Sequence, residues 1–100
     1  MTPLEFVQAW YLSQCNGEWE HVRGVTIETL DNPGWLVTID LFQTALEDRG
    51  MTPVREEREA TDWLECRIEN NQFRGAGDSR KLDAILAVFQ DWATQRDRVK

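Results

Sequence analysis

Residues 25–40 read VTIETLDNPGWLVTID, and this stretch decides the fold. On both sides of its centre, apolar and polar residues alternate, which is typical of half-buried strands. The centre favours a turn, because Pro fixes φ, Gly tolerates positive φ, and Asp or Asn can bond the nearby backbone. The stretch therefore predicts a β-hairpin at the middle of the chain, with five residues as its structural turn: Asp31, Asn32, Pro33, Gly34 and Trp35.

The register of this hairpin constrains its loop. Directly opposed residues of an antiparallel pair lie on the same face of the sheet. A plain four-residue loop over 31–34 would set Ile27 opposite Thr38, whereas placing Ile27 on the same face as Val37 requires an odd-numbered loop or a bulge. We therefore expect an irregular turn, with Gly34 in a conformation open mainly to glycine.

The neighbouring segments predict a helix before the hairpin and more strands after it. Thr2-Pro3-Leu4-Glu5 has the pattern of a capping box that begins a helix, and Asn16-Gly17 suits its end. Val54–Glu59 has helical propensity, but it is short and lies between strands, so we interpret it as an exposed strand whose charges discourage edge pairing. Trp63–Glu69 alternates like a strand, and Asn70-Asn71 predicts a two-residue hairpin after it.

The last third of the chain predicts the end of the sheet and a closing helix. We expect Gly75-Ala76-Gly77 to break the sheet, and Asp78 or Ser79 to cap the helix. Apolar residues then recur at helical spacing, at Leu82, Ile85, Leu86, Phe89 and Trp92.

Residues 1–100 thus predict a single α+β domain. It has an antiparallel sheet of about four to five strands, with an N-terminal and a C-terminal helix packed on one face. The other face would be wet and acidic and would carry Trp63, and residues 96–100 are expected to fray.

Charge and composition narrow the possible partners. The chain carries 11 basic and 18 acidic residues, a net charge of −7. This balance argues against nucleic-acid binding and against docking on anionic membranes. It suits a basic protein partner, or solubility alone. With neither a signal peptide nor a membrane-spanning stretch, and with Cys15 and Cys66 read as small buried hydrophobes, we expect a cytoplasmic protein.

The residues that could bind a metal or act in catalysis are better explained by structural roles. Cys15, Glu18, Glu20 and His21 lie close in sequence, but a metal site needs at least three converging ligands and the chain has one His. A local hydrogen bond is the simpler role for His21. A Cys15/His21 nucleophilic pair is possible in principle, but no third residue to orient it stands out.

Two further patterns also have simpler readings. The 75–78 turn resembles a phosphate-binding loop, but it lacks the Walker lysine and brings an acidic Asp78. Glu56, Glu57 and Glu59 fit a solvated strand better than an acid–base set. The sequence therefore predicts no catalytic residues, no metal and no cofactor.

Among the five Trp residues, two are candidates for an interface. Trp10, Trp35 and Trp92 fall in apolar patterns and are expected in the core. Trp19 is flanked by two Glu, and Trp63 lies on the predicted open face, so these two are either interface anchors or caps of the sheet end.

Two long blocks resemble the immunity protein 53 family of bacterial polymorphic toxin systems. They are WYLSQCNGEWEH at 10–21 and GVTIETLDNPGW at 24–35. The resemblance covers nearly the whole chain, and it extends to Asp62-Trp63, Asn71-Gln72-Phe73, Gly77-Asp78 and Phe89-Gln90-Asp91-Trp92. It implies a small cytoplasmic protein that binds and neutralises a cognate toxin, delivered by contact or by secretion, without catalysing a reaction.

The toxin-binding surface must then come from physical reasoning. An acidic inhibitor can occlude the active site or substrate surface of a basic toxin such as a nuclease. We hypothesise that the contacts are Trp19, Glu20, Glu28, Asp40, Trp63 and Glu65, and we expect a monomer or a weak dimer. Two alternatives stay open: a small enzyme that uses Cys15 and His21, and a structural module that oligomerises through its open sheet face.

Overall fold

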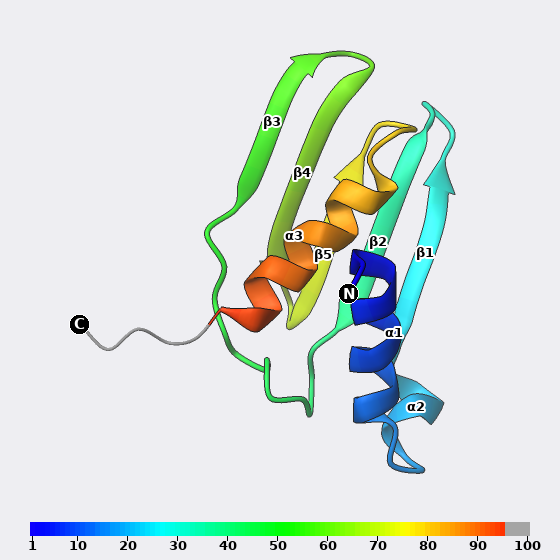
Figure 1. Ribbon diagram of the computed structural model, residues 1–100, viewed down its shortest axis with the longest axis vertical. Helices are drawn as coiled ribbons and strands as arrows, with labels where there is room; N and C mark the ends of the chain where they lie inside the picture. Colours follow the sequence, from blue (N-terminus) through cyan, green and yellow to red (C-terminus); the bar gives the residue numbers. More distant parts are fainter. Residues whose placement is uncertain (96–100) are drawn as a thin grey trace, which may run out of the picture.

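The computed structural model describes residues 1–95 and shows a five-stranded antiparallel sheet of order β1-β2-β5-β4-β3. The two longer helices, α1 and α3, lie on one face of that sheet (Figure 1). In chain order the elements are α1 (Pro3–Gln14), α2 (Trp19–Val22), β1 (Val25–Leu30), β2 (Gly34–Asp40), β3 (Val54–Glu59), β4 (Asp62–Glu69), β5 (Gln72–Gly77) and α3 (Leu82–Thr94). The predicted α+β class is confirmed. The expected fraying of 96–100 falls outside the described residues.

The central hairpin has the register that its alternation predicts. Ile27 pairs with Val37, and Leu30 pairs with Gly34, so the loop holds the three residues 31–33 and is odd-numbered as expected. The prediction for Gly34 is wrong, because its φ is not positive. The reason for a glycine there is space: a Cβ on Gly34 would collide with the carbonyl oxygen of Gly77 on the neighbouring strand β5.

The expected break at residues 75–77 is also wrong. Gly75 and Gly77 belong to β5, which pairs with β2 on one side and β4 on the other. A Cβ on Gly75 would collide with Ile85, and one on Gly77 would lie 2.6 Å from the Cβ of Lys81. These glycines therefore let the start of α3 lie close against the sheet instead of ending it.

The predictions for the ends of the helices and strands are confirmed in part. The capping box of α1 is present, since Glu5 donates its N–H to Thr2 Oγ1 at 3.1 Å and Thr2 donates its N–H to Glu5 Oε1 at 2.9 Å. The N-cap of α3 is Lys81, not Asp78 or Ser79. Two strand predictions hold: Val54–Glu59 is an edge strand, and Asn70 and Asn71 form the two-residue turn, with φ of 53° and 56°. Of the two cysteines expected to be buried, Cys66 is buried and Cys15 is half-buried.

The core fills the space between the sheet and the helices. Phe89 lies at its centre, with its ring centroid 5.3 Å from those of Trp10 and Phe73. Burying a side chain of this size stabilises the fold by about 1.5–3 kcal/mol. Alternation sends the other strand residues to the opposite side of the sheet, which we call the open face: Thr26, Glu28, Thr38, Asp40, Trp63, Glu65, Arg67 and Glu69.

Candidate partner-binding surface

Trp19 belongs to the core and is not a surface anchor. The single turn of α2 folds it beneath α1, where its side chain packs edge-on against Trp10 with ring centroids 6.0 Å apart. Its indole Nε1 donates to the carbonyl oxygen of Phe42 at 2.9 Å, and the residue is 3% exposed. At 3% exposure the ring offers almost no surface to a partner, which argues against the predicted contact role of Trp19.

The Glu20 carboxylate is engaged within the chain. It accepts hydrogen bonds from the backbone N–H of Asn16 at 2.9 Å and of Gly17 at 2.8 Å. Backbone N–H groups, first that of Glu20 itself and then that of Asn16, hold the pKa of the Glu20 carboxyl below its ordinary value. Glu20 therefore fixes the loop that joins α1 to α2, and the geometry gives it a structural role.

Asp40 is engaged in a similar way at the end of β2. Its carboxylate accepts from the backbone N–H of Gly24 at 2.9 Å and from the Gln72 side-chain amide at 2.8 Å. These bonds connect the entry to β1 with β2 and β5. Asp40 is half-buried, and its carboxylate has a structural role, since its hydrogen bonds are made within the chain.

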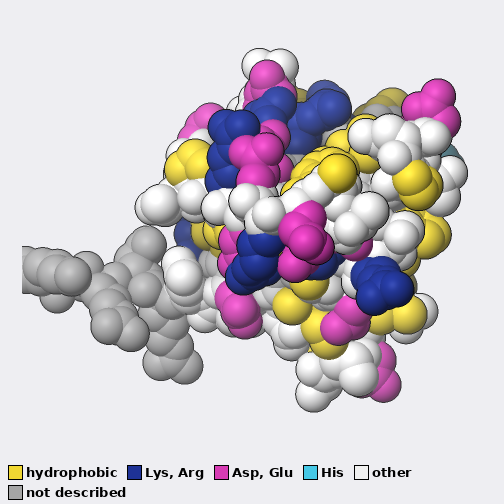
Figure 2. All heavy atoms as spheres, turned by 90° about the horizontal axis from the view of Figure 1, so that it is seen from above, with side chains coloured by type: hydrophobic (Ala, Val, Ile, Leu, Met, Phe, Trp, Pro, Cys, Tyr) yellow, Lys and Arg dark blue, Asp and Glu magenta, His cyan; other side chains and the backbone are white. Residues whose placement is uncertain are grey.

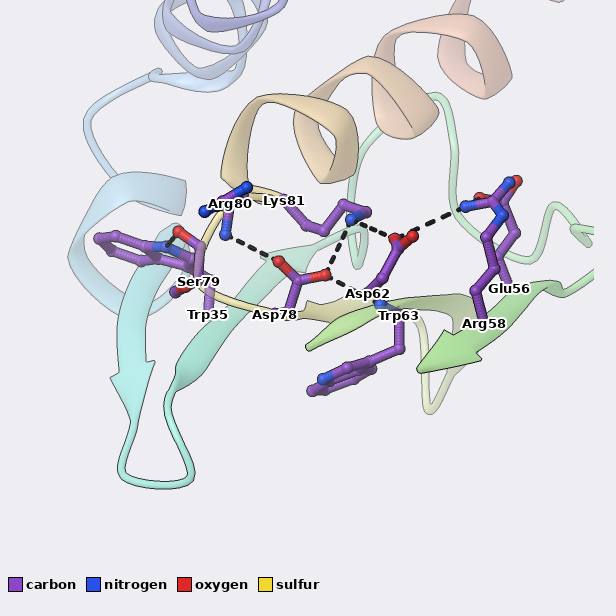
Figure 3. A network of polar contacts seen from close by, with 9 residues as sticks. All are labelled: Trp35, Glu56, Arg58, Asp62, Trp63, Asp78, Ser79, Arg80 and Lys81. Atoms are coloured by element: carbon purple, nitrogen blue, oxygen red, sulfur yellow. Dashed lines mark hydrogen bonds and ion pairs between the residues drawn. The ribbon is translucent and has the colours of Figure 1, made fainter. Parts of the chain in front are cut away.

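Three of the six candidate contacts remain available on the open face. Glu28 is exposed and makes no ion pair with any residue in 1–95. Trp63 is half-buried, and Figure 3 shows its ring on the side of the sheet away from α3. Glu65 is engaged in part, since it lies 2.9 Å from the Arg67 guanidinium and 3.6 Å from that of Arg55.

The open face is less acidic than predicted over β3, β4 and β5. Arg55, Arg67 and Arg74 lie among its carboxylates and pair with them, for example Arg67 with Glu69 at 3.1 Å. Exposed pairs of this kind stabilise a fold by about 0–1 kcal/mol each. Figure 2 likewise shows basic and acidic side chains interspersed at the end of the molecule that it presents.

The negative charge is concentrated elsewhere, in the first half of the chain. Residues 1–48 contain eight Asp and Glu residues against Arg23 alone, whereas residues 49–100 contain ten acidic and ten basic residues. Residues 1–48 include α1, α2, β1 and β2, which lie together on one side of the molecule (the blue and cyan side of Figure 1). A count by halves of the sequence would have revealed this asymmetry, but only the fold assigns it to one side.

A buried ionic network lies where β4, β5 and α3 meet. Asp78 is 3% exposed and accepts from the backbone N–H of Trp63 and the Nζ of Lys81, both at 2.8 Å, and from the N–H of Arg80 at 2.9 Å. These donors, led by Lys81, lower the pKa of Asp78 to about 2. Lys81 also donates to Asp62 at 2.7 Å, and Figure 3 shows the chain of contacts from Asp78 outward.

This network reads as structural. The carboxylate of Asp78 already accepts from the N–H of Arg80, which is the kind of donor that a phosphate would need between β5 and α3. Each of its ions has an opposite partner within the fold.

The residues of the alternative enzyme hypothesis do not form an assembled site. Cys15 Sγ donates to the carbonyl oxygen of Tyr11 at 3.3 Å. His21 is exposed, and its side chain makes no hydrogen bond within residues 1–95, so its predicted local bond is not found. Burial raises the pKa of the Cys66 thiol to about 12.

Across residues 1–95, no group of three or more His, Cys, Asp and Glu side chains is placed to hold a metal ion. Nor is any helix there long and apolar enough to cross a membrane.

Comparison with known protein families gives a match over most of the chain. The family model for Immunity protein 53 matches residues 4–94, which is most of the chain. No curated protein and no solved structure matches the chain.

Proposed function

The chain belongs to the immunity protein 53 family, and we propose from this that it binds and neutralises a cognate toxin of a bacterial polymorphic toxin system. The observation that carries the proposal is the extent of the family match, which runs from residue 4 to residue 94 and so includes every strand, all of α3 and all of α1 except Pro3. In this proposal the protein acts in the cytoplasm by binding alone, with no reaction and no cofactor.

The charge distribution supports a basic toxin. Residues 1–40, which form α1, α2, β1 and β2, hold six acidic residues against Arg23 alone. Their net charge of −5 creates a field on one side of the molecule that attracts a positive surface and raises the rate of encounter. A toxin that acts on nucleic acid needs such a positive surface, so covering it would also exclude the substrate. The acidic side is thus proposed to occlude the active site or the substrate surface of the toxin.

Glu28 is the leading contact on this side. It is exposed and lies on the edge strand β1, and it is free of ion pairs within residues 1–95. Trp63 and Glu65 are retained as secondary contacts further along the open face. Trp19, Glu20 and Asp40 leave the proposal because their side chains are already engaged inside the fold.

Co-expression tests the proposal directly. The C-terminal toxin domain encoded by the adjacent reading frame is expressed in a susceptible bacterium, with and without this chain. We expect the chain to restore growth, and we expect Glu28→Lys to weaken the purified complex by at least about tenfold and to reduce its salt dependence. Failure of the wild-type chain to restore growth or to bind the domain would refute the pairing.

A further inference from the structure

The two edges of the sheet differ in how they are protected. The β3 edge carries charges at every position from Arg55 to Glu59, and its register with β4 shifts between Glu57 and Glu59. Charges and irregularities of this kind discourage another strand from pairing with an edge. The β1 edge has one charge, Glu28, and all six of its pairs with β2 are in regular register.

The backbone of β1 offers free hydrogen-bonding groups at this edge. Asp40 donates its N–H to the carbonyl oxygen of Gly24 at 3.0 Å, which makes Gly24 and Asp40 a hydrogen-bonded pair. Such pairs alternate along an antiparallel ladder, so Thr26 and Glu28 also bond to β2. The N–H and C=O groups of Val25, Ile27 and Thr29 therefore point outward.

An apolar pocket lies beside the same edge, between α1 and β1. It has a volume of about 410 Å³, and Leu4 and Tyr11 of α1 line it together with Val25 and Ile27 of β1. Leu4 of α1 is 50% exposed and Ile27 of β1 is 40% exposed. Val7, which is also in α1, is buried and packs into the core. Helix α1 is thus apolar on an outer side as well as an inner side, and its outer side continues the apolar face of β1.

The charges around this edge select one kind of partner. Glu28 projects on the open face, and the half of the chain that contains it carries the whole net charge of −7. Arg23 is the one charged residue that lines the pocket, so a cation is disfavoured there. A second copy of this chain would bring two strongly negative sides together, whereas a basic partner would neutralise them.

We infer that an extended segment of the toxin adds to β1 as a sixth strand. Its backbone bonds the outward groups of Val25, Ile27 and Thr29. Neighbouring residues on paired strands share a face, so an apolar side chain beside Ile27 enters the pocket and a Lys or Arg lies beside Glu28. This inference rests on the proposed function and adds to it the docking edge and the pattern of the segment that docks.

The variants that test the inference exploit the direction of the N–H groups. Thr29→Pro removes an outward donor and leaves the ladder with β2 intact, because proline is tolerated on an edge strand where its nitrogen faces solvent. Thr29→Ala keeps that donor and is the matched control. Ile27→Asp places a charge at the pocket, and Leu12→Asp introduces the same charge on α1 at a residue that is 72% exposed and outside the pocket.

Binding of the purified toxin domain encoded by the adjacent reading frame is measured for each variant by calorimetry, with circular dichroism to show that each one is folded. We expect Thr29→Pro and Ile27→Asp to bind at least about tenfold more weakly, and both controls to bind like the wild type. Hydrogen exchange should show the amides of Val25, Ile27 and Thr29 exchanging fast in the free chain and at least about tenfold more slowly in the complex.

The outcomes separate the two proposals. If the wild-type chain does not bind the toxin domain, the proposed function fails and the docking inference fails with it. If the wild type binds but both test variants bind equally well, or the three outward amides stay fast, the docking inference alone is wrong. Light scattering that shows a dimer of the free chain, converted to a monomer by Thr29→Pro, would assign the edge to a second copy and overturn the inference.

Discussion

Asp78 shows how one residue acquires its role from its donors. It is the one charged side chain that is buried within residues 1–95, and backbone N–H groups and Lys81 surround its carboxylate. An acidic residue after a glycine-rich stretch predicts a helix cap at Asp78. That prediction is wrong, because the carboxylate binds Lys81 and the N–H of Trp63, which the sequence places 15 residues away.

The acid stability of the fold should depend on Asp78. Its pKa in the fold is about 2, against an ordinary value of 3.8, and hydrogen bonding from Lys81 also lowers the pKa of Asp62. The ionised carboxylates therefore stabilise the fold fully above about pH 4, and this stabilisation is lost as the pH falls toward about 2.

We expect Asp78→Asn to lower the melting temperature at pH 7 by at least about 5 °C and to flatten the loss of stability below pH 4. Thermal unfolding followed by circular dichroism over a pH series measures both effects, and Asp83→Asn on the exposed side of α3 is the control. If Asp78→Asn loses stability below pH 4 as steeply as the wild type does, other carboxylates govern the acid sensitivity of the fold.

Trp19 and Trp63 should separate stability from binding. Trp19→Ala removes a buried ring and is expected to lower the free energy of unfolding by about 3–5 kcal/mol. Trp63→Ala should lower it by only about 1 kcal/mol, yet weaken the toxin complex by about tenfold. Urea unfolding and calorimetric titration measure the two quantities. A Trp19→Ala variant that kept its stability and lost binding would reverse these assignments.

At the scale of elements, alternation predicted pairing better than glycine predicted breaks. The hairpin over 25–40 and the pairing of Ile68 with Phe73 follow from a period of two, which is a property of the strands themselves. The role of Gly75 depends on the close approach of α3, and the sequence does not show how near two distant elements lie. The burial of Trp19 could not be predicted either. Its two Glu neighbours suggested exposure, and its packing against Trp10 is a tertiary contact that the sequence does not show.

Gly75→Ala tests the close packing of β5 against α3. The added methyl group would collide with Ile85, so we expect a loss of about 1–3 kcal/mol in the free energy of unfolding. Gly50→Ala is the control, because nothing lies within 4 Å of its added Cβ and its φ is not positive. In a double mutant, Ile85→Ala should reduce the cost of Gly75→Ala. Equal costs with and without Ile85 would mean that another contact sets the limit.

At the scale of the whole molecule, charge and edge protection are asymmetric in the same direction. Residues 49–100, which have no net charge, contain the edge strand β3, whose charges discourage pairing. Residues 1–48, which are negative, contain the edge strand β1, which has no such protection. The sequence predicted an acidic binder and a protected β3, but it could not place the charge, because the positions of β1 and β2 beside α1 arise from tertiary packing. A partner drawn in by the negative side would meet the one edge that is free to pair.

Calorimetric titration of the purified toxin domain into the wild-type chain is the most direct test of toxin binding. The account predicts a one-to-one complex that weakens by at least about tenfold when the salt concentration rises from about 0.05 M to about 0.5 M, since salt screens the attraction between the negative side and a basic partner. An absence of binding at the lower salt concentration would contradict the claim that this chain is the immunity partner of that toxin.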